Sequence, residues 1–180
     1  MDDRGRAARL PKKRMAAGVV FLDDEQRMLV VKPTYQPKWL VPGGIVEEHE
    51  SPRAACRREV REELGLDVEA GRLLCVEYGS AAGSDSEYLH FIFFGGTLSA
   101  AQRQAIRIDN AEIEGFRLVN RDEALSKLDE RLARRIALAL SALGRDGAIY
   151  AEDGKEPAPE TGAISAGCVA PGPGRSCRGS

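Results

Sequence analysis

One stretch of the sequence, from Gly44 to Leu66, is GIVEEHESPRAACRREVREELGL. The second half of this stretch is predicted to be an α-helix. Ser51 can accept hydrogen bonds from the first free amides of that helix, and Pro52 suits the first helical position, where its missing N–H costs nothing. Gly65 is expected to end the helix, because glycine readily adopts the left-handed backbone of a C-terminal cap. The stretch therefore predicts a loop followed by one helix.

The predicted helix carries a row of acidic side chains. At about 100° per residue, Glu59, Glu62 and Glu63 fall on one arc of its surface. Carboxylates at these spacings repel one another, which lowers helix stability unless something compensates. The row is either a solvated acidic face neutralised by neighbouring arginines, or a site for a hard divalent cation such as Mg²⁺, which prefers oxygen ligands. An adjoining apolar stripe, which would dock the helix on a sheet, consists of Cys56, Val60 and Leu64.

The spacing of the whole stretch separates these two interpretations. After Gly44 there are five free positions before Glu50, and seven more before the pair Arg58-Glu59. A match over so many spaced positions is a strong signal. The pattern resembles the Nudix box, the signature of the Nudix hydrolases, at every position that the signature defines: Gly44, Glu50, Arg58, Glu59, Val60, Glu62, Glu63, Gly65 and Leu66. The resemblance implies an α+β fold of the Nudix type, an α/β/α sandwich in which a mixed β-sheet lies between helices.

The resemblance also implies an activity, the hydrolysis of a diphosphate bond by water with the help of Mg²⁺ or Mn²⁺. Arg58 would orient Glu59 through a charge-assisted hydrogen bond. Glu50 would mainly hold the loop against the helix. The metal ligands that the resemblance implies are Glu59, Glu62, Glu63 and the carbonyl of Gly43.

Several glutamates are candidates for the general base that activates the water. It could be a glutamate of the box, Glu59 or Glu62, or a glutamate outside it. Glu112 and Glu114 stand at the start of a predicted strand and are the candidates outside the box. We favour Glu112, since the extra carboxylate of the family often lies in a loop at this stage of the chain. A surface role is the better interpretation of Glu114.

The implied substrate is a nucleoside diphosphate linked to another moiety, such as a nucleoside triphosphate or a nucleotide sugar. The alternative is a non-catalytic Nudix-type sensor or regulatory domain that binds a nucleotide metabolite. The intact box, and the lack of a helix-turn-helix pattern after Leu143, favour the enzyme and argue against a DNA-binding module. Tyr35 and Trp39 could stack on a base, although Trp39 could equally belong to the core. His49 and His90 are interpreted as structural.

The remaining elements are predicted from hydrophobic patterns and turn residues. Two pairs of antiparallel strands are expected, the second joined by the Gly/Ser/Ala-rich turn 79–86, followed by one more strand and a helical region in two pieces. Strands, a helix, strands and then helices suggest a mixed sheet between helices. The expected ranges are 16–22 and 27–31 for the first pair, 67–78 and 87–98 for the second pair, 112–119 for the last strand and 122–143 for the helices.

Composition bounds the rest of the interpretation. Residues 15–143 are expected to form the Nudix hydrolase domain, after a basic, disordered N-terminus at 1–14 and before a Gly/Pro-rich disordered tail at 144–180. The net charge of −2 gives no general attraction to nucleic acid, and no apolar run is long enough to span a membrane. We expect a cytoplasmic protein that acts on a small nucleotide-type substrate and could form a homodimer.

The four cysteines do not show the close spacings of a zinc site. Cys56 and Cys75 are expected to be core thiols of a reduced protein, while Cys168 and Cys177 fall in the expected tail.

Overall fold

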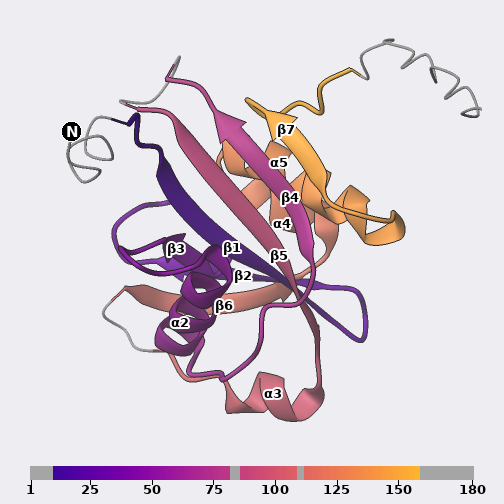
Figure 1. The fold of residues 1–180 in the computed structure, drawn as a ribbon. Coiled ribbons are helices and arrows are strands. Elements are labelled where there is room, and N and C mark those ends of the chain that lie inside the picture. Colours follow the sequence, from indigo (N-terminus) through magenta and orange to yellow (C-terminus); the bar gives the residue numbers. More distant parts are fainter. Residues whose placement is uncertain (1–9, 82–85, 109–111, 159–180) are drawn as a thin grey trace, which may run out of the picture.

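A computed structural model describes residues 10–81, 86–108 and 112–158 (Figure 1). Within these residues, seven strands form one mixed sheet with the order β6-β2-β1-β5-β4-β7, and β3 pairs with β1 off this path. The strands are β1 (Arg14–Asp23), β2 (Met28–Pro33), β3 (Gly43–Ile45), β4 (Leu73–Gly79), β5 (Tyr88–Leu98), β6 (Ile113–Val119) and β7 (Ile149–Glu152). The helices are α2 (Pro52–Leu64), α3 (Ala100–Ala105), α4 (Arg121–Lys127), α5 (Glu130–Ser141) and the 3₁₀ helix η1 (Ala142–Gly144).

The long strand β1 is the centre of the sheet. It pairs with β2 and β3 on one side, both antiparallel, and with β5 in parallel on the other. Because side chains alternate along a strand, β1 contributes to both faces of the sheet. Ala17, Val19 and Phe21 belong to a core shared with α2, whereas Val20 and Leu22 belong to a core shared with α4 and α5.

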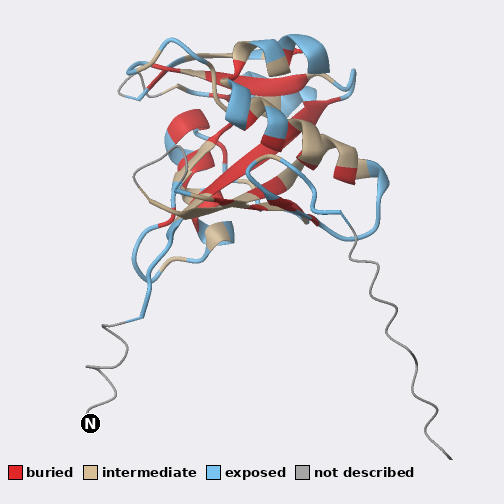
Figure 2. Ribbon diagram, turned by 90° about the horizontal axis from the view of Figure 1, so that it is seen from above, coloured by how far each residue is buried: buried red, intermediate tan, exposed pale blue. Residues whose placement is uncertain are grey.

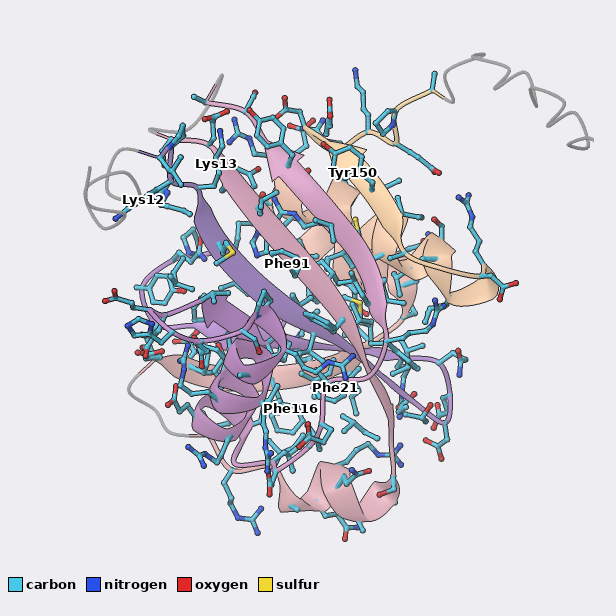
Figure 3. The ribbon with its side chains drawn as sticks, viewed as in Figure 1. Lys12, Lys13, Phe21, Phe91, Phe116 and Tyr150 are labelled. Atoms are coloured by element: carbon cyan, nitrogen blue, oxygen red, sulfur yellow. The ribbon has the colours of Figure 1, made fainter. Side chains whose placement is uncertain are left out.

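The sheet therefore lies between helices, which confirms the predicted α/β/α sandwich. Figure 1 shows α2 on one side of the sheet and α4 with α5 on the other. Figure 2 shows that buried positions follow the strands and the sheet-facing sides of the helices. Phe21, Phe91 and Phe116 lie on the side that α2 covers (Figure 3). None of the helices in the described part of the chain is long and apolar enough to span a membrane.

Most of the expected elements are confirmed, with shifts at their ends. The hairpin of β1 and β2, the helix over Pro52–Leu64 and the two helical pieces α4 and α5 are present. The antiparallel pair β4–β5 is also present, but β4 begins at Leu73 instead of residue 67. The preceding residues form a loop, since Asp67 pairs with Arg57 of α2 and the amide of Gly71 donates to Phe94 of β5. Cys56 and Cys75 are buried and free, as expected.

Three elements were not predicted. One is the short strand β3, because Gly43 and Gly44 were expected to lie in the loop before the helix, whereas they pair with β1. Another is the short helix α3, which begins with a capping box in which Ser99 and Gln102 each bond the other's backbone amide. The third is β7, which pairs in parallel with β4.

The strand β7 corrects the start of the expected tail. Ile149 and Ala151 are buried, so the chain is ordered well beyond residue 144. The sequence Ile-Tyr-Ala-Glu does alternate apolar and polar residues, but it is only four residues long and is surrounded by glycine and charged residues. The outer parts of both expected tails, 1–9 and 159–180, and part of the expected turn 79–86 lie outside the described residues.

The role of β7 in stability can be tested with two neighbouring residues. Ile149 is 5% exposed and packs in the core between the sheet and α5, whereas Tyr150 is 49% exposed on the same strand. We expect Ile149→Ala to lower the free energy of unfolding by about 2–4 kcal/mol in urea titrations, because a buried cavity is created. The matched control Tyr150→Ala should change it by less than about 1 kcal/mol. Equal, negligible effects of both variants would mean that β7 does not pack on the sheet.

Candidate active site

Two glycines bring the loop before α2 into contact with β1 and with the helix. Gly43 has a φ of 141°, and a Cβ added there would overlap the carbonyl oxygen of Ala17 and lie 2.6 Å from the Cα of Gly18. Only glycine allows this close approach of β3 to β1. At Gly44 an added Cβ would overlap the carboxylate of Glu59. The carboxylate of Glu59 therefore lies directly against the loop backbone.

The ends of α2 form as their sequence predicts. The Ser51 side chain accepts a hydrogen bond from the amide of Ala54 at 3.2 Å, and Gly65, with a φ of 66°, donates its amide to the carbonyl of Arg61. The apolar stripe of the helix is buried against the sheet: Cys56, Val60 and Leu64. With its buried side fixed in this way, the helix turns its acidic row toward Gly43 and Gly44.

Arg58 is the centre of the polar network at this site. Its Nε and Nη2 donate to the two carboxylate oxygens of Glu50, each at 3.0 Å. Its Nη1 donates to Glu59 at 2.9 Å and to Glu62 at 3.1 Å, and Nη2 also reaches the carbonyl of Ile45 at 3.0 Å. These bonds to carboxylates raise the pKa of Arg58 and, through the same guanidinium, lower the pKa of Glu50. One guanidinium thus joins the loop to three glutamates of the box.

Glu63 is the most buried of the acidic row, at 6% exposed. It accepts a hydrogen bond from the amide of Gly43 at 3.0 Å. Burial above all, together with the negative charges of neighbouring glutamates, raises the pKa of Glu63 to about 8 despite the opposing effect of that bond; these neighbours are Glu59, Glu112 and Glu62. The pKa of Glu59 is also raised, mainly by burial. These carboxyl groups are crowded, and their mutual repulsion is not fully offset by the residues around them.

Glu112 faces the same group of carboxylates from another part of the chain. The backbone carbonyl of Glu112 accepts the amide of Thr34 at 2.8 Å, which ties the start of β6 to the loop after β2. The negative charge of Glu112 contributes to the raised pKa of both Glu59 and Glu63. Glu114, two residues further on, is instead paired with Lys32 at 3.3 Å. The two candidate bases outside the box are therefore in different surroundings.

The aromatic and histidine residues considered from the sequence lie in several environments. Tyr35 is 71% exposed near the carboxylates, and its pKa is raised by desolvation of the hydroxyl and by the charges of Glu63, Glu112 and Glu59. Trp39 is half-buried, with Arg117 and Lys127 at 5.4 and 5.6 Å from its ring, which favours a structural role. His49 is exposed on the loop before α2. Burial and the charge of Arg135 lower the pKa of His90 to about 3, so its imidazole is neutral near pH 7.

The acidic residues suit a hard divalent cation, although they are not arranged around one. In the described part of the chain, no three acidic, histidine or cysteine side chains are gathered as metal ligands. Arg58 holds Glu59 and Glu62, and the amide of Gly43 holds Glu63. Oxygen donors are nevertheless the ligands that Mg²⁺ and Mn²⁺ prefer. A cation would also stabilise the ionised form of Glu63, which burial and, to a lesser extent, neighbouring charges disfavour, so the residues fit such an ion once the side chains of Glu59 and Glu62 turn from Arg58.

A cavity of about 350 Å³ beside β3 was not anticipated from the sequence. Apolar side chains and the ring of Tyr88 form part of its lining, together with His90 and three arginines. These residues come from β1, β3, β5 and α5, which are far apart in the chain, so no local pattern could reveal the cavity. The only local feature of the sequence that pointed to this cavity was the group of arginines at the start of α5. The three arginines are Arg14, Arg131 and Arg135.

A mixed sheet between helices, with a glycine loop and a glutamate-rich helix joined by one arginine, defines a protein of the Nudix class. The family model described as "NUDIX domain" matches residues 12–140. The chain belongs to the Nudix family of hydrolases.

Individual relatives agree with this assignment. The chain is 44% identical over 64 residues to diphosphoinositol polyphosphate phosphohydrolase 2 of Rattus norvegicus, an alignment that covers 35% of this chain and 36% of that protein. The chain thus spans about a third of the length of the curated relatives it matches. Among solved structures, a UDP-X diphosphatase is similar with a TM-score of 0.65, 21% identity and coverage of 84% of this chain and 75% of that chain. A MutT NUDIX hydrolase from Burkholderia pseudomallei has a TM-score of 0.56, 26% identity and coverage of 74% and 99%.

The raised pKa of Glu63 predicts how the stability of the metal-free protein depends on pH. A carboxyl with a pKa of about 8 in the folded state and an ordinary value of 4.5 binds more protons folded than unfolded between these values. The stabilisation of the folded state by this group is therefore fully present below pH 4.5, and it is lost as pH rises to about 8. The lowered pKa of His90 makes the protein more stable as pH rises from about 3 to 6.5, which opposes the effect of Glu63. The effect of Glu63 on stability is therefore best measured between pH 6.5 and 8.

In that window we expect the free energy of unfolding of the metal-free protein to fall, by an amount on the order of a few kcal/mol at most. Glu63→Gln should remove most of the decline, whereas Glu48→Gln, which changes a side chain that is 90% exposed, should keep it. Chelator-treated protein unfolded by urea at several pH values provides the measurement. A decline of the same size in Glu63→Gln would show that another group is responsible.

Proposed function

We propose that this chain hydrolyses a diphosphate bond in a small molecule that contains a nucleoside diphosphate linked to another moiety, such as a nucleoside triphosphate or a nucleotide sugar. The observation that carries this proposal is the crowding of Glu59, Glu62 and Glu63 beside the Gly43-Gly44 loop, with Arg58 in contact with two of the three. Such a crowd of carboxylates is costly in a purely structural helix. It is useful where a divalent cation and an anionic substrate must be held together.

The residues of this site divide the work of such a reaction. Glu59, Glu62 and Glu63, with the carbonyl of Gly43, would hold Mg²⁺ or Mn²⁺, which when bound neutralises the diphosphate and acidifies the attacking water. Glu50 keeps Arg58 in place through its two bonds, so that the guanidinium stays beside the site when Glu59 and Glu62 turn away from it. Arg58 thereby fixes the loop relative to the helix, and positioning of this kind supplies much of the rate enhancement.

Glu112 is the general base in this proposal. Its negative charge contributes to the raised pKa of Glu59 and Glu63. Within the described residues, however, its carboxylate forms no hydrogen bond or ion pair. A base must be free to accept a proton from the water. In this proposal Glu59 and Glu62 would be occupied as metal ligands, and Glu114 is paired with Lys32. Glu112 is therefore the carboxylate best suited to the role.

The cavity beside β3 supports a substrate with a substantial moiety next to the diphosphate. Ile45 connects the two regions, because its carbonyl accepts a bond from Arg58 and the residue also lines the cavity. Tyr88 and apolar side chains of the cavity can pack against a base or a sugar. The names of the similar proteins, a diphosphoinositol polyphosphate phosphohydrolase and a UDP-X diphosphatase, also refer to small molecules with diphosphate groups.

The proposal is tested by incubating the purified protein with Mg²⁺ and a panel of nucleoside di- and triphosphates, nucleotide sugars and dinucleotides, and following the phosphorylated products. We expect turnover of at least one compound that contains a diphosphate bond. Glu62→Gln should lose this activity, since an expected metal ligand is removed. Glu112→Gln should lower kcat by about 10²–10⁴-fold with little change in KM, as for loss of a general base.

Glu114→Gln is the matched control, because it makes the same change two residues away on a side chain that points to Lys32. Its kcat should stay close to that of the unmodified protein. Activity of Glu112→Gln equal to that of the control would exclude Glu112 as the base and leave Glu59 and Glu62 as the candidates. Binding of a nucleotide metabolite without turnover of any compound would instead identify a sensor domain.

A further inference from the structure

The cavity beside β3 extends well away from the carboxylates. Ile45 of β3 is paired with Ala16 of β1, and Ala16 is paired with His90 of β5. Neighbouring strands are ~4.8 Å apart, so the cavity reaches roughly 10 Å across the sheet from Ile45 to His90. Tyr88, two residues before His90, lies further along the same strand. A group bound near Tyr88 is therefore not the diphosphate that would lie beside Gly44.

Two arginines at this far end form no ion pair within the described residues, although the charge of Arg131 helps to lower the pKa of the Asp153 carboxyl, after the effect of its hydrogen bonds with Ser80. Arg14 lies at the start of β1, directly beside Tyr88 in the strand register, and Arg131 lies in the first turn of α5. Both line the cavity, and within residues 10–81, 86–108 and 112–158 neither guanidinium forms a hydrogen bond or an ion pair. Asp129, the acidic residue of the lining, accepts bonds from the amides of Arg131 and Leu132 as the helix cap. Asp129 and Asp153 together offset only part of the positive charge of the arginines at this end of the cavity.

The other arginines nearby are already paired, which makes the contrast informative. Arg134 forms an ion pair with Glu130 at 2.9 Å, and the buried Arg135 is paired with the buried Glu77. Arg135 also donates to the hydroxyl of Tyr88 at 3.3 Å and lies 5.6 Å from its ring. The Glu77–Arg135 pair thus holds the ring of Tyr88, another residue of the cavity lining, in place.

We propose that this end of the cavity binds a second anionic group, a phosphate or a carboxylate, carried by the moiety attached to the diphosphate. The proposal rests on the function proposed above and narrows its substrate class. Arg14 and Arg131 are specificity-determining residues, because a guanidinium binds either anion through charge-assisted hydrogen bonds. The apolar side chains Met15, Leu40 and Leu132 contact the uncharged part of the same moiety. Substrates that end in a neutral group leave Arg14 and Arg131 without an ion pair.

Pairs of compounds that differ only in the second anionic group test this inference. NADPH and NADH, and coenzyme A and dephospho-coenzyme A, differ by one phosphate ester that is not part of the diphosphate. UDP-glucuronate and UDP-glucose differ by a carboxylate, so this pair separates carboxylate from phosphate recognition. Affinity is measured by calorimetry with the Glu62→Gln variant and Mg²⁺, and kcat/KM is measured with the unmodified protein. We expect the more anionic member of at least one pair to be favoured about tenfold in both measurements.

The preference should depend on the two unpaired arginines. In Arg14→Gln and Arg131→Gln it should fall severalfold, through KM and not kcat, and in the double variant it should vanish. Arg121→Gln, which removes the same charge from the exposed first residue of α4, should keep the preference. The preference should also shrink at high salt, since both arginines are exposed to solvent.

The outcomes separate the two proposals. Equal affinities and equal kcat/KM within every pair, or a preference that survives in the double variant, would overturn the anionic subsite while leaving the hydrolase proposal intact. Preferential binding of the anionic member without turnover of any compound would support the subsite and overturn the hydrolase proposal. Absence of both binding and turnover for all six compounds would overturn the subsite.

Discussion

The guanidinium of Arg58 joins the two halves of the Nudix box. It contacts Glu50 at the end of the loop, Glu59 and Glu62 on the helix, and the carbonyl of Ile45 at the end of β3. Without this group the loop would be tied to the helix mainly through Glu63 and Gly43, and three carboxylates would face one another with little compensation. Arg58 is therefore the side chain that contributes most of the polar contacts between the loop and α2, beside the pairing of β3 with β1.

The packing of α2 and β3 against β1 holds this polar network in position. The apolar stripe of α2 is buried against β1, and Gly43 allows β3 to approach β1 so closely that no larger residue would fit. These contacts hold Glu63 in a buried position where its ionisation is disfavoured. Burying a carboxylate in this way is unfavourable unless a cation or a proton compensates. The arrangement resembles other functional sites, in which an unfavourable local environment is maintained by the stability of the surrounding structure.

Features fixed by neighbouring residues could be predicted from the sequence, whereas features fixed by distant contacts could not. Ser51, Pro52 and Gly65 act within one or two turns of α2, so both ends of this helix were predicted correctly. The spacing of the box identified the residues that the structure gathers around Arg58. The capping box of Ser99 and Gln102 was a local signal for α3 that was missed. The strand β7 depends on pairing with β4, some 70 residues earlier, and the cavity depends on four separate elements, so neither has a local signature.

The central claim is that the carboxylates gathered beside Gly43 and Gly44 form a site for a divalent cation. Titration of the metal-free protein with Mn²⁺, followed by calorimetry or electron paramagnetic resonance, tests this claim most directly. The account predicts that the unmodified protein and the Glu48→Gln control bind Mn²⁺ alike, and that Glu63→Gln, while folded, binds it at least about tenfold more weakly. Unchanged affinity of Glu63→Gln, or no Mn²⁺ binding by the unmodified protein, would contradict it.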